Sequence, residues 1–141
     1  MSKYWVAGAT GFLGSHLVRT LLERGHQVIA VSKSGGVVNG VDVAAVDILD
    51  EATVAQSARE VDGAFLVTGR VSRDRNDAEL LHRDNVLGTE SALRALRAAG
   101  VKRVVVASTS GTLAVSRDPD SIADETCRAP LEVIARDAAR H

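Results

Sequence analysis

Residues 4–17 read Tyr-Trp-Val-Ala-Gly-Ala-Thr-Gly-Phe-Leu-Gly-Ser-His-Leu, and this stretch is the most informative part of the chain. A short apolar strand leads into Gly8, Gly11 and Gly14, and an amphipathic helix follows them. A strand, a glycine turn and a helix in this order form a phosphate cradle for a dinucleotide. Gly8 permits a sharp turn, Gly11 lets the backbone approach a pyrophosphate, and Gly14 lets the helix pack on the strand. The N–H groups and positive dipole end of the helix would then face the phosphates.

The composition is that of a single soluble globular domain. The chain has 141 residues, of which 45% are hydrophobic and 25% are charged, and its net charge is −1. This charge and an aromatic content of 3% argue against a nucleic-acid partner. No apolar stretch is long enough to span a bilayer and no signal-peptide pattern is present, so we expect a cytoplasmic protein without a membrane partner. The single cysteine, Cys127, agrees with a reducing compartment.

Apolar runs alternate with helical patterns along the chain, which predicts an α/β fold. We expect a Rossmann-like doubly wound parallel sheet of about five strands in the order 3-2-1-4-5, with helices on both faces. Residues 1–141 would form one dinucleotide-binding domain, whose last part, about residues 117–141, is irregular or a short helix. The segments Ser34–Gly36 and Arg70–Asp77 are expected to be loops. The expected strands are Tyr4–Ala7, Gln27–Val31, Asp42–Val46, Ala64–Val67 and Arg103–Ala107, and the expected helices are Phe12–Arg24, Glu51–Arg59 and Asp77–Ala99.

Several motifs in this order resemble one known family. The chain is similar to the extended short-chain dehydrogenase/reductases, the NAD-dependent epimerase/dehydratase group, and within it to dihydroflavonol-reductase-type members. The resemblance covers nearly the whole chain, and it implies the dinucleotide-binding part of an oxidoreductase. The motifs that carry it are Gly-Ala-Thr-Gly-Phe-Leu-Gly at 8–14, Asp47-Ile48, Asn85-Val86-x-Gly88-Thr89, the serine-rich turn Ser108–Thr112, and Asp124-Glu125-Thr126.

The resemblance also assigns residues to the cofactor. Asp47 would accept a hydrogen bond from the adenine amino group, with Ile48 packed on the ring. The alternative for Asp47 is a helix N-cap, for which Asp50 is the better candidate. Residues 67–69 would face the adenosine, or simply end a strand. The glycine turn and these segments together predict the cofactor residues Gly8, Thr10, Gly11, Phe12, Leu13, Gly14, Asp47, Ile48, Val67, Thr68 and Gly69.

The end of the second strand indicates which dinucleotide is preferred. An acidic residue about twenty positions beyond the glycine turn would bind the ribose 2′-hydroxyl of NAD. Here Ser32 stands near that position and Lys33 follows it. A cation favours a 2′-phosphate, whereas a carboxylate would repel it, so we predict NADP in preference to NAD. The alternative is that Lys33 is a solvated loop residue.

Proton transfer depends on residues that the resemblance places late in the chain. Thr109 or Ser110 would be the catalytic hydroxyl, depending on the alignment, and a turn-capping role is the alternative. The family's Tyr-x-x-x-Lys should lie at or just beyond residue 140, but the only tyrosine is Tyr4 and no lysine follows Lys102. We therefore expect this chain alone to be inactive. Either it is part of an enzyme acting on a small carbonyl, alcohol or nucleotide-sugar substrate, or it is a non-catalytic NADP-binding regulatory module.

Other polar residues carry weaker signals. The four histidines show no metal-ligand spacing, so we predict no metal site. The cluster of Arg70, Arg73 and Arg75 with Asp74 and Asp77 could approach a phosphate, but a mixed-charge loop is more often a solvated face, which is the interpretation we favour. The apolar surface that a missing substrate-binding part would leave favours a homo-oligomer, although the sequence leaves the oligomeric state open.

Overall fold

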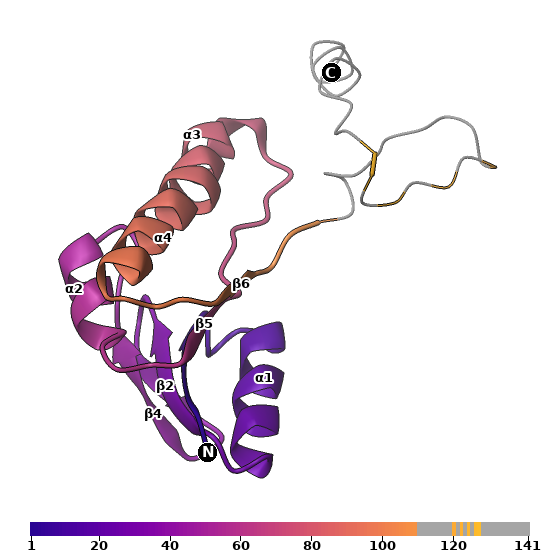
Figure 1. The fold of residues 1–141 in the computed structure, drawn as a ribbon. Helices are drawn as coiled ribbons and strands as arrows, with labels where there is room; N and C mark the ends of the chain where they lie inside the picture. Colours follow the sequence, from indigo (N-terminus) through magenta and orange to yellow (C-terminus); the bar gives the residue numbers. More distant parts are fainter. Residues whose placement is uncertain (110–119, 121, 123, 125, 128–141) are drawn as a thin grey trace. The chain divides into compact units, whose positions relative to one another are not determined.

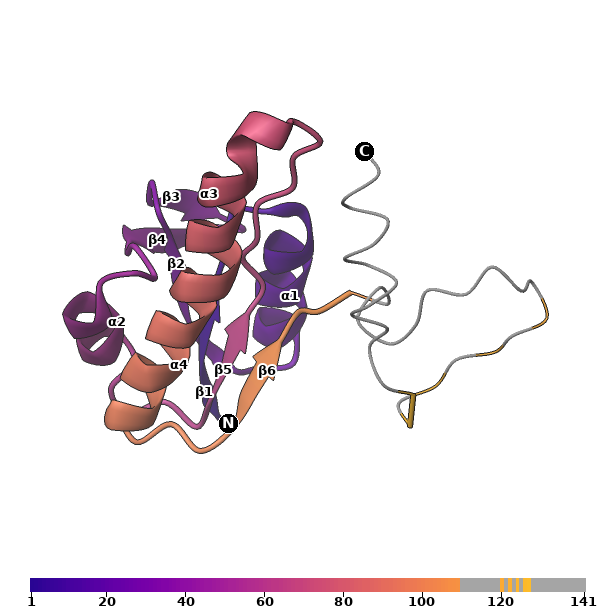
Figure 2. The ribbon, with the colours of Figure 1, turned by 90° about the horizontal axis from the view of Figure 1, so that it is seen from above.

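The computed structural model describes residues 1–109, 120, 122, 124, 126 and 127. The chain divides into two units, residues 1–107 and 108–141. The first unit is a sheet with helices on both faces, α1 on one side and α2 and α4 on the other (Figures 1 and 2). In the second unit, the carboxylate of Asp124 accepts hydrogen bonds from the N–H and hydroxyl of Thr126. The expected irregular end, residues 117–141, lies largely outside the described residues.

The sheet has the order β3-β4-β2-β1-β5-β6. All five expected strands are present within one residue of their expected bounds, and they are parallel in the predicted order. The α/β Rossmann-like fold is therefore confirmed. These strands are β1 (Lys3–Ala7), β2 (Gln27–Ser32), β4 (Val41–Ala45), β5 (Gly63–Leu66) and β6 (Val104–Val106).

A sixth strand, β3 (Gly36–Val38), corrects the expectation of a five-stranded, wholly parallel sheet. It pairs antiparallel with β4 at the sheet edge, so Gly36 belongs to a strand rather than to a loop. Asn39 and Gly40 connect the two strands, with φ values of 51° and 76°. Positive φ at both central residues suits a two-residue hairpin turn, and Asn-Gly is a strong sequence signal for it. The Asn-Gly pair is therefore a local hairpin signal in the sequence. The prediction of a parallel sheet did not include it.

The helices follow the apolar patterns with one difference. Helices α1 (Phe12–Glu23) and α2 (Glu51–Ser57) match the expectation, and the carboxylate of Asp50 caps α2 by accepting from the Ala52 and Thr53 N–H groups. The expected continuous helix Asp77–Ala99 is instead a succession of shorter helical segments. Side-chain periodicity did not reveal this because each segment continues the path of the one before it. The segments are the 3-10 helix η1 (Arg75–Asp77), α3 (Ala78–Leu81), the π-helix η2 (His82–Leu87) and α4 (Gly88–Ala98).

The core lies on both faces of the sheet, because successive residues of β1 point to opposite sides. Trp5 is fully buried with Leu66 and Leu96 on the face that α2 and α4 cover. Its indole Nε1–H donates to Ser57 Oγ at 3.0 Å. Val6 is fully buried with Val18 of α1 on the other face. Burial on both sides explains why β1 is almost wholly apolar.

A substitution at Gly14 tests how closely α1 packs on the turn after β1. A Cβ at Gly14 would lie 2.7 Å from the carbonyl carbon of Gly8 and 2.9 Å from Ala9 Cα, where only a backbone shift makes room. We expect Gly14→Ala to lower the free energy of unfolding by about 2–3 kcal/mol. Urea unfolding followed by the fluorescence of Trp5, the only tryptophan, measures it.

Gly11→Ala is the matched control for this prediction. A Cβ at Gly11 would contact only the Gly8 carbonyl oxygen, at 3.3 Å, among the described residues. Its expected cost is about 1 kcal/mol or less. Equal losses of stability in the two variants would contradict the packing role of Gly14.

Candidate functional site

A cleft of about 420 Å³ opens beyond the carboxyl ends of β1, β2, β4 and β5. In an open parallel sheet, ligands bind at this edge, where the strand order reverses. Ten of the predicted cofactor residues line the cleft, which brings together segments from four separate strands. These residues are Gly8, Thr10, Gly11, Ser32, Lys33, Asp47, Ile48, Val67, Thr68 and Gly69.

The glycine turn forms one wall of the cleft without any side chain from the glycines. Gly8 has φ +79°, and a Cβ there would lie 2.8 Å from the carbonyl oxygen of Val67, so this position requires glycine. The N–H groups of Gly8 and Ala9 both donate to Val31 O, which ties the turn to the end of β2. The turn therefore has a fixed path between β2 and β5.

The first N–H groups of helix α1 have no hydrogen-bond partner among the described residues, and they point along the helix axis. Its N-cap, Gly11, is extended and offers no side-chain cap. The Ser15 N–H donates to Gly11 O, the first bond of the α-helical pattern. The N–H groups of Phe12, Leu13 and Gly14 precede that bond and are available to an anion. A glycine cradle with an uncapped helix start fits the diphosphate of a dinucleotide.

The three predicted residues that do not line the cleft are Phe12, Leu13 and Gly14. The Phe12 side chain is 85% exposed and packs on the ring of His16, with centroids 4.8 Å apart. Leu13 is also exposed, whereas Gly14 is buried beneath the turn. At these three positions a ligand would contact the backbone N–H groups rather than the side chains.

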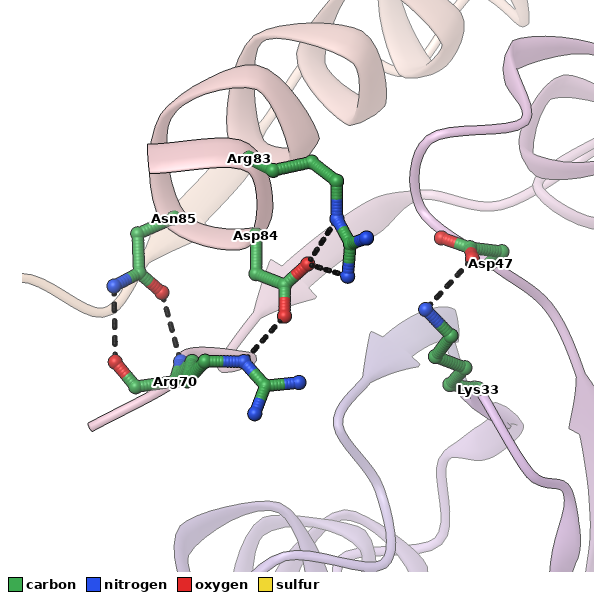
Figure 3. Close-up of polar contacts among 6 residues, drawn as sticks. All are labelled: Lys33, Asp47, Arg70, Arg83, Asp84 and Asn85. Carbon is green, nitrogen blue, oxygen red and sulfur yellow. Dashed lines mark hydrogen bonds and ion pairs between the residues drawn. The ribbon is translucent and has the colours of Figure 1, made fainter. Parts of the chain in front are cut away.

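Lys33 and Asp47 meet at the rim of the cleft (Figure 3). The Lys33 Nζ lies 3.1 Å from Asp47 Oδ2, while Asp47 Oδ1 accepts the Leu49 N–H at 3.1 Å. The hydrogen bond from Leu49, followed by the contact with Lys33, lowers the pKa of Asp47 against the opposing effect of burial. Ser32 is buried, and its hydroxyl donates to Gly35 O. Lys33 thus places a positive charge at this rim, and the Ser32 hydroxyl forms a hydrogen bond within the loop that follows β2.

Arg70 and Asp84 line the cleft but were not predicted as site residues, and neither was Asn85, which contacts Arg70. Arg70 is exposed and also lines the cleft, so for this residue the structure favours the alternative of a phosphate contact. The side-chain amide of Asn85 accepts the Arg70 N–H at 2.7 Å and donates to Arg70 O at 2.9 Å. Asp84 Oδ2 lies 2.6 Å from Arg70 Nε (Figure 3). The motif that begins at Asn85 marked this helix as important, but nothing in the sequence pointed to residue 70 as its partner.

The predicted catalytic hydroxyls are not part of the first unit. Thr109 belongs to the second unit, and Ser110 lies outside the described residues. Both assignments stay predictions. Among the residues that the structure describes, no group of three or more His, Cys, Asp or Glu side chains is placed to hold a metal ion. None of the described helices is long and apolar enough to cross a membrane.

Comparisons with known proteins show which family the chain is similar to. The NAD dependent epimerase/dehydratase family matches residues 4–133. A putative dihydroflavonol 4-reductase of Synechocystis sp. is 34% identical over 133 residues, 92% of this chain and 38% of that protein. Cinnamoyl-CoA reductase 1 of Petunia hybrida is 32% identical over 136 residues, 86% of this chain and 40% of that protein. The chain thus spans about two-fifths of the length of these curated relatives.

Solved structures give the same result. UDP-glucose 4-epimerase of Thermus thermophilus, in complex with NAD, superimposes with a TM-score of 0.75 at 28% identity, over 98% of this chain and 51% of that chain. The corresponding epimerase of Brucella ovis, also in complex with NAD, has a TM-score of 0.73 at 25% identity, over 98% and 46%.

The Lys33–Asp47 contact predicts a titration that NMR can follow. The ionised Asp47 is favoured in the fold, so its pKa lies below the ordinary 3.8. We expect Lys33→Met to raise this pKa without reaching 3.8, because the Leu49 N–H, the larger cause, remains. The stabilisation is present above the unfolded-state pKa and is lost as pH falls through the folded value. An unchanged pKa of the Asp47 carboxyl in Lys33→Met would contradict the ion pair.

Proposed function

The chain belongs to the NAD-dependent epimerase/dehydratase family, whose cofactor is a nicotinamide dinucleotide, and we propose that its cleft binds NADP in preference to NAD. The main observation in favour of NADP is the Lys33 ammonium group, which lies at the cleft rim just after β2. A carboxylate at the end of this strand would bind the 2′-hydroxyl of NAD and repel the 2′-phosphate of NADP.

The contact between Lys33 and Asp47 leaves Lys33 available to a phosphate. The two side chains are 67% and 39% exposed, respectively. An ion pair this exposed contributes about 0–1 kcal/mol. A phosphate carries a larger negative charge than one carboxylate, so it competes well for the ammonium group.

The rest of the cleft supplies the other parts of a dinucleotide site. The glycine turn and the first N–H groups of α1 would hold the diphosphate. Asp47 and Ile48 would hold the adenine, and Val67 to Gly69 would lie along the adenosine. Ile48 Cδ1 occupies the space above Gly88, where a Cβ would lie only 2.8 Å away, so a larger residue at 88 would displace this part of the cleft wall.

For the complete protein we propose oxidoreduction of a small-molecule carbonyl or alcohol, or of a nucleotide sugar. The bound cofactor would supply or accept the hydride. Thr109 or Ser110 would donate a hydrogen bond to the substrate oxygen, and a further acid would deliver the proton, because an alcohol alone is a poor acid at neutral pH. The reductases and epimerases to which this chain is similar support this class of reaction.

Lys33→Ala tests the preference for NADP. We expect wild type to bind NADP more tightly than NAD, since a charge-assisted contact contributes about 1.5–3 kcal/mol, or roughly ten- to hundred-fold in affinity. The variant should lose this difference while its affinity for NAD stays the same. Calorimetric titration with both cofactors measures it. A wild type that binds both equally, or a variant that still prefers NADP, would refute the preference.

Gly11→Val tests the glycine turn as the phosphate site. A side chain at this extended, exposed position meets little of the protein, so the fold should persist, but it would occupy the space of a bound diphosphate. We expect an unchanged circular dichroism spectrum and no thermal shift on addition of NADP. Glu23→Val, at the other end of α1, is the control and should keep the shift. A full shift in Gly11→Val would rule out this turn as the phosphate site.

A further inference from the structure

Arg70 and the glycine turn line the same cleft because β1 and β5 are paired. Their register places Ala7 opposite Leu66, and the Val67 N–H donates to Ala7 O at 3.1 Å. The chain leaves both strands at the same edge, so Gly8 and Val67 remain in contact beyond the sheet. Arg70 follows three residues later and lines the same cleft as Thr10 and Gly11. A cation therefore shares the cleft with the helix start that offers N–H groups to an anion.

The backbone and side chain of Arg70 are both held from the π-helix η2. Asn85 makes two hydrogen bonds to the backbone of Arg70, one to its N–H and one to its carbonyl oxygen. Asp84, the preceding residue, accepts from the guanidinium Nε at 2.6 Å. Figure 3 shows these two residues approaching Arg70 from the same helix. An arginine fixed at its backbone and at Nε has lost much of its freedom before any ligand arrives, which lowers the entropic cost of binding one.

This arrangement orients the guanidinium group and leaves positive charge on the cleft wall. Asp84 is shared with Arg83, whose Nη2 lies 2.9 Å from Oδ1, so two arginines surround one carboxylate. Hydrogen bonds from both arginines lower the pKa of Asp84, which is therefore ionised at neutral pH. The three side chains together carry one net positive charge. Arg70 uses only Nε in the contacts that the described residues make, and its two terminal nitrogens are left for a ligand.

We propose that Arg70 is a binding residue for the diphosphate of the dinucleotide, acting opposite the N–H groups of α1. Paired terminal nitrogens suit phosphate oxygens, which they bind in a fork. Lys33 follows β2 and pairs with Asp47, whereas Arg70 follows β5 and is held by η2, so the two cations serve different phosphates. This inference rests on the proposed function, because it assumes that the cleft holds a dinucleotide.

Two small probes separate the roles of the cations. ADP carries the diphosphate without a 2′-phosphate, and adenosine 2′-monophosphate carries the reverse. We expect Arg70→Gln to weaken the binding of ADP, NAD and NADP by a similar factor of about ten or more. It should change the affinity for adenosine 2′-monophosphate less than about two-fold. Lys33→Ala should show the opposite selectivity between the two probes. NMR titration measures the weak probes, and calorimetry measures the dinucleotides.

Two control variants show whether a loss of affinity in Arg70→Gln comes from the lost ligand contact or from a disturbed fold. Arg73→Gln makes the same change three residues away, at an exposed position that does not line the cleft, and should leave every affinity within about two-fold. Arg70→Lys keeps the charge without the fork, so it should retain more affinity for ADP than Arg70→Gln does. Thermal unfolding shows whether each variant is folded. If Arg70→Gln does not fold, the affinity of Arg70→Lys for ADP, compared with that of wild type, tests the role of Arg70.

The outcomes distinguish this inference from the proposed function. If wild type binds neither NAD nor NADP, the proposed function fails and the inference fails with it. If wild type binds them and Arg70→Gln binds ADP as well as wild type does, only the inference is overturned. Losses confined to NADP and adenosine 2′-monophosphate, or equal losses in the Gln and Lys variants, would also overturn it.

Discussion

The close approach of helix α1 to the turn after β1 is the constraint on which the rest of the first unit depends. A Cβ at Gly14 would run into the backbone of Gly8, and one at Gly8 would run into the carbonyl of Val67. Because no side chain intervenes, the start of α1, the end of β1 and the end of β5 meet at one edge of the sheet. This contact brings the N–H groups of the helix start to the edge where the cleft opens.

The charges of the cleft are arranged around this backbone frame. Positive side chains come from the end of β2, from the segment after β5 and from η2, and each is in contact with a carboxylate. Asp47 and Asp84 are both stabilised as anions by hydrogen bonds and neighbouring cations, so they remain charged at neutral pH. The Lys33–Asp47 pair is exposed enough for Lys33 to exchange its carboxylate for a more highly charged phosphate. Arg70 contacts Asp84 through Nε, so its terminal nitrogens can bind a ligand while that pair stays intact. The cleft is thus prepared for an anionic ligand without burying an unpaired charge.

The limits of sequence reasoning follow from what each signal measures. Short apolar runs predicted the five parallel strands to within a residue. The physical reason is clearest for β1 and β5, which are largely buried within the sheet. Apolar periodicity passed over β3, whose three residues are too few to show a period, although the Asn39-Gly40 turn carried a local signal. It also joined α3, η2 and α4 into one helix, since their different hydrogen-bonding patterns leave the side-chain spacing nearly helical. The 3-10 helix η1 lies where a loop was expected. Asp50 was correctly expected to cap α2 because N-capping is local.

The sequence by itself determined the glycine turn, the order of the parallel strands and the positions of Lys33 and Asp47 at strand ends, because these depend on local geometry and the right-handed crossovers of parallel sheets. Only the tertiary structure decided that Lys33 contacts Asp47 and that Asp84 and Asn85 hold Arg70. These partners are 14 or 15 residues apart in sequence. Lys33 and Asp47 follow different strands, whereas Arg70 and η2 lie far apart within the one connection between β5 and β6. No spacing rule connects such residues, since their distance is set by how the strands pair and how η2 packs over the cleft.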